Sequence, residues 1–307
     1  MNKQDIQNKI NSVHSNSQYV RVSEEHPLEL FIGRDEQGLP TLRFNGKFNP
    51  VKIVGSGFLE IKQVKTAFYN SLLFVFNSRD NISLFLSFCE DIINQTEKFA
   101  GGDGYTEIVN RYNLWRKMFY SSSKLLNENE IMGLIGELLF LKDDTFVKKG
   151  ISNGLNGWSG PEPTHKDFSF GSDWFEIKSI SSSKPSITIS SIEQLDSDVD
   201  GVLVVYSFEK MSPSYDGIKL NDLVTNILSL LELEVDKDLF IEKLKQVGYS
   251  YNEVYDNYVY NLSSVYRYDV REGFPRIKAD MLPLGIIRTR YDIVLSSIEK
   301  FRRHSND

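Results

Sequence analysis

The sequence predicts a mixed α/β (α+β) chain built from three successive parts. Short apolar runs separated by turn residues fill residues 20–80, a rhythm typical of antiparallel sheets. Between 101 and 210, segments with helical spacing are followed by short apolar runs that read as strands, which predicts a second part made of both helices and strands. We therefore expect an N-terminal β-rich domain over residues 1–100, a core over 101–210 and a helical or mixed C-terminal region over 211–307.

The N-terminal part is predicted to hold several strands followed by one helix. The predicted strands cover 28–33, 41–44, 57–64 and 71–76. Asn45-Gly46 is a candidate hairpin turn, because both residue types adopt positive φ readily. Apolar residues over 81–98 have helical spacing and place Cys89 in the core. The glycine-rich run at 101–104 then predicts a flexible break before the second part.

The core is predicted to open with two helices, over 105–120 and over 129–141. In the second helix the apolar residues recur at helical spacing, and Asn127 or Asn129 can cap its start. Glu137 lies inside this apolar stretch. Since an ionised carboxylate is rarely buried without a partner, we expect a cation beside Glu137, and a metal ion would serve.

Residues 167–178 read Asp-Phe-Ser-Phe-Gly-Ser-Asp-Trp-Phe-Glu-Ile-Lys and predict a β-hairpin. The Gly-Ser-Asp triplet at 171–173 is a turn signal between two apolar runs. Alternate side chains of a strand share a face, so Glu176 and Lys178 are neighbours on the second strand. Folding back at the turn brings Asp167 beside Glu176.

Two carboxylates and an ammonium so placed suit the metal-dependent hydrolysis of a phosphodiester. Carboxylate oxygens are the ligands that Mg²⁺ prefers, and Mn²⁺ can use the same set. The ion would neutralise the phosphate and lower the pKa of a bound water, while Lys178 orients that water or offsets negative charge. The spacing also fits an ordinary ion pair on an exposed strand, with Asp167 capping a turn.

The order of these residues resembles the PD-(D/E)XK nuclease superfamily, which includes many restriction endonucleases and DNA repair nucleases. The resemblance rests on Gly136-Glu137-Leu138-Leu139, on Asp167 and on Glu176-Ile177-Lys178. With Gly157-Trp158-Ser159-Gly160-Pro161 and His165-Lys166-Asp167-Phe168 added, the pattern is similar to a bacterial family described as "putative PD-(D/E)XK" proteins. It spans roughly residues 128–210 at motif level. Lys166 is a departure, because the superfamily has a proline there.

The resemblance implies a restriction-endonuclease-like core, with a central mixed sheet flanked by helices, and Mg²⁺-dependent cleavage of DNA. In it, Glu137, Asp167 and Glu176 hold the metal ion, and Lys178 acts on the attacking water or the developing charge. The implied role is restriction or defence against foreign DNA, as a homodimer or together with other subunits of a defence system.

The sequence after Lys178 predicts further parts of the core. Residues 186–195 read as a strand entering a helix that Ser190 or Ser191 could cap. Gln194 falls in that helix, where related nucleases often have an auxiliary polar residue. The apolar run 202–206 then reads as a buried strand.

The net charge of −7 argues against a protein that coats nucleic acid indiscriminately, since phosphate contacts need clustered Lys and Arg. The distribution of charge matters more than its sum, and the segment 265–303 is rich in cations and aromatic rings. Its cations are Arg267, Arg271, Arg276, Lys278, Arg288, Arg290, Lys300, Arg302 and Arg303. This segment is the candidate DNA-binding surface, and a charged solvated face is an equally good interpretation.

Several classes of protein have no support in the sequence. A single cysteine excludes an intramolecular disulfide and a Cys-rich zinc site, and the four histidines show no paired metal-binding spacing. No Gly-Lys-Ser phosphate loop and no Gly-x-Ser-x-Gly elbow occur, which argues against an ATPase and a serine hydrolase. No apolar run could span a membrane and no signal peptide is visible, so we expect a cytoplasmic protein.

Two other functions stay open at this level. A nuclease-like fold could serve as a non-catalytic binding or assembly subunit, although such a module has no need for clustered acids. An RNA nuclease would use the same site chemistry, because the 2′-hydroxyl is read by contacts outside the motif. His165, beside the site, could ligate metal or contact phosphate, but a loop histidine is more often only solvated.

Overall fold

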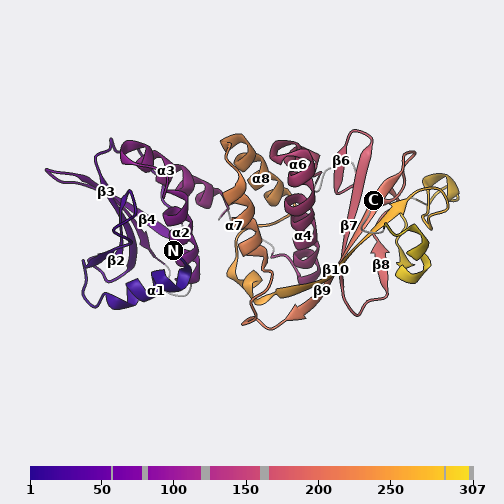
Figure 1. Ribbon diagram of the computed structural model, residues 1–307, viewed down its shortest axis with the longest axis horizontal. Helices are drawn as coiled ribbons and strands as arrows, with labels where there is room; N and C mark the ends of the chain where they lie inside the picture. Colours follow the sequence, from indigo (N-terminus) through magenta and orange to yellow (C-terminus); the bar gives the residue numbers. More distant parts are fainter. Residues whose placement is uncertain (57, 78–81, 119–124, 160–165, 287, 304–307) are drawn as a thin grey trace. The chain divides into compact units, whose positions relative to one another are not determined.

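The computed structural model describes residues 1–56, 58–77, 82–118, 125–159, 166–286 and 288–303 of the chain. They form two compact units, Met1–Tyr120 and Ser121–Asp307, each with its own helices and sheet (Figure 1). The mixed α/β class predicted from the sequence is confirmed. None of the helices in the described ranges combines the length and the apolar character that crossing a bilayer requires.

The first unit contains, in its described residues, one antiparallel sheet and three helices. Its elements are α1 (Lys3–Ser12), β1 (Tyr19–Arg21), β2 (Glu29–Arg34), β3 (Pro40–Gly46), β4 (Leu59–Lys65), β5 (Asn70–Phe76), α2 (Ile82–Gln95) and α3 (Gly101–Met118). The strands lie in the order β1-β2-β3-β5-β4. The four predicted strands and the helix around the buried Cys89 are therefore confirmed, with ends shifted by a few residues.

Two local predictions for this unit are wrong. Asn45-Gly46 is not a hairpin turn: both residues lie inside β3 and pair with Ser71 and Asn70 of β5. The run 101–104 is not a flexible break but the first turn of α3, so the compact units divide after Tyr120 and not at residue 100. Packing explains the second error, because a Cβ on Gly104 would lie 2.4 Å from the Leu28 side chain.

The second unit contains, in its described residues, a four-stranded mixed sheet in the order β10-β9-β7-β6. Its elements are α4 (Glu128–Phe140), η1 (Leu141–Thr145, π-helical), α5 (Phe146–Lys149), α6 (Ile151–Gly157), β6 (Phe168–Phe170), β7 (Asp173–Ser181), β8 (Ser186–Ile189), η2 (Ile192–Gln194), β9 (Gly201–Met211), α7 (Leu220–Leu230), α8 (Glu234–Gln246), η3 (Glu253–Asn257), β10 (Val259–Val270), η4 (Ala279–Met281), β11 (Tyr291–Val294), η5 (Leu295–Ser297) and η6 (Glu299–Phe301). The long helices lie on one side of this sheet, and the β8–β11 pair lies on the other (Figure 1).

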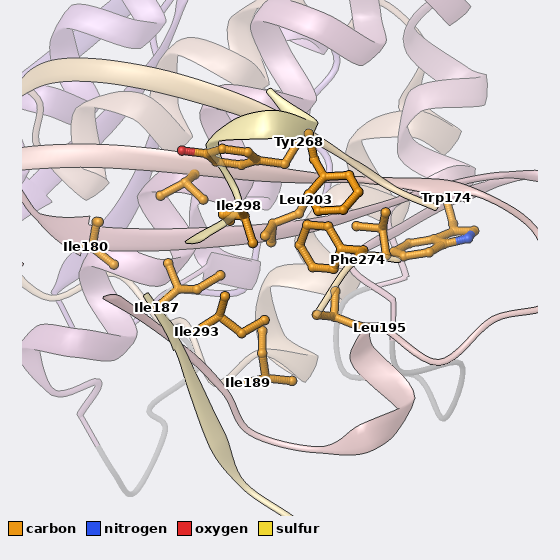
Figure 2. Packing of buried hydrophobic residues seen from close by; sticks show 13 residues of the cluster. Trp174, Ile180, Ile187, Ile189, Leu195, Leu203, Tyr268, Phe274, Ile293 and Ile298 are labelled. Carbon is orange, nitrogen blue, oxygen red and sulfur yellow. The ribbon is translucent and has the colours of Figure 1, made fainter. Parts of the chain in front are cut away.

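The two faces of β7 pack against different neighbours. Figure 2 shows Trp174 and Ile180 in an apolar cluster that includes Leu203 of β9 and residues of β8 and β11. Side chains alternate along a strand, so Glu176 and Lys178 belong to this face of β7. The opposite face of β7 meets α4.

The sequence left open whether the part after residue 210 is separate, and in the structure it contributes a strand to the sheet. β10 pairs antiparallel with β9 along its whole length, so the core predicted to end at residue 210 needs the chain beyond it. β7 and β9 are parallel neighbours, which confirms the buried strand predicted over 202–206. After β8, the predicted helix is wrong: the chain forms only the short 3-10 turn η2.

Candidate active site

Helix α4 carries Glu137 to the sheet. The helix begins with a capping box, in which the side chain of Asn127 accepts from the amide of Glu130 and the Glu130 carboxylate accepts from the amide of Asn127. One residue before Glu137 the helix lies very close to β7, since a Cβ on Gly136 would lie 2.1 Å from Ser179 Oγ. This close approach places the Glu137 carboxylate beside the strand.

The β6–β7 hairpin carries Asp167 and Glu176, as predicted. Phe168 pairs with Phe175 in the antiparallel register, so Asp167, one residue earlier, stands opposite Glu176. Asp167 Oδ2 accepts a hydrogen bond of 2.6 Å from the amide of Ile177. The side chain of Asp167 thereby continues the ladder by one bond beyond the end of β6.

Glu176 and Lys178 form an ion pair on the same face of β7. Lys178 Nζ lies 2.7 Å from Glu176 Oε1. Glu176 is fully buried, and among the described residues neither of its carboxylate oxygens receives a hydrogen bond of acceptable angle. An unsatisfied buried carboxylate is costly, so this ion pair alone leaves Glu176 incompletely neutralised.

The three carboxylates interact with one another. Burial raises the pKa of Glu137 to about 8, and the nearby Asp167 and Glu176 add to the rise. Burial likewise raises the pKa of Glu176 to about 8, again with a contribution from Asp167. Burial also raises the pKa of Asp167, against the effect of Lys178. The charges of Asp167 and Glu176 thus lie close enough to Glu137 to act on its ionisation.

Lys178 is the cation nearest to this cluster. Burial lowers the pKa of Lys178, but the carboxylates of Glu176 and Asp167 outweigh that effect and the pKa is raised. Its Nζ also donates a 3.0 Å hydrogen bond to Gln194 Oε1, and the same oxygen accepts a 2.8 Å bond from the amide of Ser190. Gln194 therefore lies at the site as the sequence suggested, although on a 3-10 turn and not in a helix.

The donor chemistry of the cluster fits a hard divalent ion. In the described part of the chain, no three His, Cys, Asp or Glu side chains stand ready around one point as metal ligands. One oxygen of Glu137 and one of Asp167 are bonded to protein donors. Carboxylates are nevertheless the ligands that Mg²⁺ and Mn²⁺ prefer, and apart from the ion pair with Lys178 the buried oxygens of Glu176 receive no hydrogen bond of acceptable geometry from the described residues.

Two further residues contact the site, and although both belong to the motifs that carry the family resemblance, neither was predicted as a site residue. The indole Nε1 of Trp158 donates a 2.9 Å bond to Glu137 Oε2. Lys166 is buried, with burial lowering its pKa to about 8, and it bonds backbone carbonyls close to Gln194. No spacing signal marks either residue. His165, the third candidate near the site, lies outside the described residues, as do Gly160 and Pro161.

The cations of the segment 265–303 fall into two groups. Six of them are engaged in contacts within the unit: Arg267 with Asp144, Arg302 with Glu299, Arg303 with Asp269, Arg271 and Lys300 over the Phe301 ring, and Arg276 with the carbonyl of Leu195. Arg267, Arg302 and Arg303 line a cavity of about 590 Å³ that none of the four predicted site residues lines. Lys278, Arg288 and Arg290 have no ion pair with another described residue and are half-buried or exposed.

Comparison with family models gives one match for the chain. A model described as "Putative PD-(D/E)XK family member (DUF4420)" covers residues 4–296. This range includes Glu137, Asp167, Glu176 and Lys178, and it extends over both compact units. Comparison with curated proteins and with solved structures gives no match.

Proposed function

The chain belongs to the family described as putative PD-(D/E)XK proteins, and from this membership we propose that it is a metal-dependent nuclease that hydrolyses DNA phosphodiester bonds. The observation that carries the proposal is the cluster of three interacting carboxylates next to the ammonium of Lys178. A binding or assembly module has no physical need for such a cluster, because buried like charges destabilise a fold.

Each residue of the cluster has a role in this reaction. Glu137, Asp167 and Glu176 would hold a Mg²⁺ or Mn²⁺ ion, which when bound polarises the phosphate and acidifies a water. Lys178 orients the attacking water or offsets the negative charge that develops on the phosphate. Trp158 fixes the Glu137 carboxylate by its indole N–H, and Gln194 fixes the Lys178 ammonium.

Lys278, Arg288 and Arg290, which have no ion pair among the described residues, are the proposed contact with DNA. The segment that carries Lys278 is anchored beside Gln194: Arg276 donates to the carbonyl of Leu195, and the amide of Ala279 donates to Asp196. Exposed cations at this place would contact phosphates of the strand that enters the site. Restriction or defence against foreign DNA is part of the same proposal. Cleavage of both strands usually uses two active sites, which favours a homodimer or further subunits.

The proposal is tested by incubating the purified protein with plasmid DNA and Mg²⁺ or Mn²⁺. We expect cleavage by the wild type that EDTA abolishes. Glu176→Gln and Lys178→Met should each lower the rate roughly a hundredfold or more, because each removes a group that acts on the transition state. Glu209→Gln, which alters an exposed carboxylate of the neighbouring strand β9, should cut at the wild-type rate.

The same assay separates the alternatives. Cleavage of RNA but not of DNA by the wild type, lost in Glu176→Gln, would identify a ribonuclease. DNA binding without metal-dependent cleavage of duplex DNA, single-stranded DNA or RNA would identify the non-catalytic subunit and refute the enzyme. A contaminating nuclease would show equal cleavage by the wild type and both site variants.

A further inference from the structure

Lys166 is a buried lysine for which the proposed hydrolysis has no direct use. Its Nζ donates hydrogen bonds to two backbone carbonyls, that of Glu193 at 2.5 Å and that of Asp196 at 2.9 Å. The same Nζ lies 4.2 Å from the centroid of the Trp174 ring, within range of a cation–π contact. Burying an ammonium is unfavourable unless its donors are matched, and here carbonyl oxygens match two of them.

The two carbonyls stand on either side of Gln194. Gln194 is the last residue of η2, a 3-10 turn of three residues that has no side-chain cap at its start. So short a turn makes few backbone bonds of its own. External donors therefore decide where its side chains point, and Lys166 binds the chain one residue before Gln194 and two residues after it.

Other donors hold the same segment farther along. Arg276 Nη1 donates to the carbonyl of Leu195 at 2.9 Å, and Trp174 Nε1 donates to the carbonyl of Val199 at 3.1 Å. Of these donors, Lys166 is the one that binds on both sides of Gln194. Its loss would free the backbone next to Gln194 while the rest of the segment stayed attached.

The carboxamide of Gln194 connects this backbone to Lys178. Its Oε1 accepts from Lys178 Nζ at 3.0 Å and from the amide of Ser190 at 2.8 Å. The bond from the Ser190 amide holds Gln194 Oε1 in place, and this oxygen in turn orients the ammonium of Lys178. A shift of the Gln194 backbone would break both bonds together.

We propose that Lys166 is a positioning residue of the candidate active site: it fixes the backbone around Gln194, so that the Gln194 carboxamide holds the ammonium of Lys178 against Glu176. The chain of contacts runs from Lys166 through the carbonyls of Glu193 and Asp196 to Gln194, and from there to Lys178. That these contacts aid catalysis rests on the proposed hydrolysis. The mechanical link, by which Lys166 holds the backbone around Gln194 through its hydrogen bonds, does not depend on that proposal.

The mechanical link is tested by amide hydrogen exchange of the full chain, measured by NMR. Lys166→Met keeps the apolar stem and removes the ammonium. We expect the Ser190 amide to exchange about tenfold faster, the change that follows from weakening one hydrogen bond. Lys166→Arg, whose guanidinium can donate to both carbonyls, should retain most of the protection.

The matched control is Lys237→Met. Lys237 is also a buried lysine, but it pairs with Glu234 inside α8 and does not contact the segment around Gln194. Ser190 should exchange at the wild-type rate in this variant. Equal acceleration in both methionine variants, or none in Lys166→Met, overturns the proposal. Should Lys166→Met not fold, Lys166→Gln replaces it, since a neutral amide can donate to one carbonyl.

The catalytic benefit is tested by a double-mutant cycle on cleavage rates. We expect Lys166→Met to lower kcat with KM unchanged, and to cause no further loss when Gln194 is already alanine. Additive losses would show that Lys166 does not act through Gln194 and would overturn the route. If the wild type cleaves nothing, the proposed function fails, while the exchange of Ser190 still decides whether Lys166 holds Gln194.

Discussion

At the scale of single residues, the site is defined by carboxylates that the fold forces together. Glu137 arrives on a helix, Asp167 ends a loop and Glu176 is fully buried in a strand. Among the described residues, the ammonium groups of Lys178 and Lys166, the indole N–H of Trp158 and the amide of Ile177 offset part of their charge. The metal-free protein therefore retains protons on this cluster that the unfolded chain would release near pH 4 to 5.

These protons predict a stability that falls with rising pH. The pKa values of Glu137 and Glu176 are raised to about 8, against about 4.3 in an unfolded chain. The stabilisation that comes from the protonated carboxyl groups of Glu137 and Glu176 is complete below their pKa in the unfolded chain. It is lost as the pH rises through their pKa of about 8 in the folded protein. The free energy of unfolding, measured with urea in EDTA, should fall over this window by at most about 1.4 kcal/mol per pH unit for each group.

Glu176→Gln provides the control for this titration. It keeps the size of the side chain and removes one ionisable group, so the slope should be smaller. The raised pKa of Lys178 does not interfere, because its contribution is lost only in more alkaline solution. A stability that rises from pH 5 to pH 8 would contradict the assignment of these pKa shifts.

Strand geometry relates Asp167, Glu176 and Lys178, which is why the sequence could indicate that these three predicted site residues lie together. Glu176 and Lys178 are two positions apart on one strand, and a single turn brings Asp167 opposite. Trp158 and Lys166 could not be found in this way. Their partners lie 21 and 27 or more residues away in sequence, and the backbone carbonyls that Lys166 binds have no residue identity to read.

At the scale of elements, the contact between α4 and β7 positions Glu137. The helix meets the strand where Gly136 faces Ser179 and Ile177. Phe140, one turn later, packs its ring against Phe175 of the same strand, with ring centroids 5.0 Å apart. How closely Glu137 approaches β7 thus depends on Gly136, whose lack of a side chain lets the helix lie against the strand.

This dependence predicts opposite effects for two glycines of α4. In Gly136→Ala the new Cβ would lie 2.1 Å from Ser179 Oγ, and we expect a loss of about 1–3 kcal/mol from overpacking. In Gly133→Ala nothing lies within 4 Å of the new Cβ, and the better helix propensity of alanine should stabilise by about 1 kcal/mol. Urea denaturation of both variants measures the difference.

A second substitution should rescue the first. Ser179→Ala removes the clashing oxygen, and the remaining contact of 3.5 Å to the Ser179 Cβ is ordinary packing. Ser179 Oγ is buried without a partner among the described residues, so its removal costs little by itself. The double variant should therefore recover most of the loss. No recovery would show that the helix is displaced for another reason.

The elements that the sequence predicted well are those with local signals at both ends. Helix α4 has a capping box, and the β6–β7 hairpin has a turn triplet between aromatic runs. The failures arose where tertiary contacts override local preference: Asn45-Gly46 is held in a strand by β5, and the glycines at 101–104 are part of a helix. The segment around Gln194 was predicted as a helix, but it forms only a 3-10 turn of three residues.

At the scale of the whole molecule, two properties depend on contacts that the sequence does not show: which cations are available for binding, and where the chain divides into compact units. A net charge of −7 coexists with a C-terminal segment whose cations differ in availability. The sequence shows the cations but not their partners, because Asp144 and Asp269 are far away along the chain or on another element. The division into two compact units likewise follows from contacts and not from the composition of a linker.

The availability of these cations predicts the salt dependence of DNA binding. Replacing Lys278, Arg288 and Arg290 by glutamine should weaken binding measured by fluorescence anisotropy in EDTA, and should reduce the slope of log K against log salt by roughly two to three. The control replaces Lys148, Arg302 and Arg303, which pair with carboxylates, and should change the slope much less. Equal slopes in both triple variants would place the DNA elsewhere.

The bond from the Ile177 amide to Asp167 bears on how an inactive protein for substrate trapping should be made. Alanine at Asp167 would remove a proposed metal ligand and also the hydrogen bond that extends the β6–β7 ladder, so that loss of activity and loss of order could not be told apart. Asparagine retains an oxygen for that amide and removes only the charge. Asp167→Asn is thus the variant with which to capture an uncut nucleic acid on an undisturbed sheet.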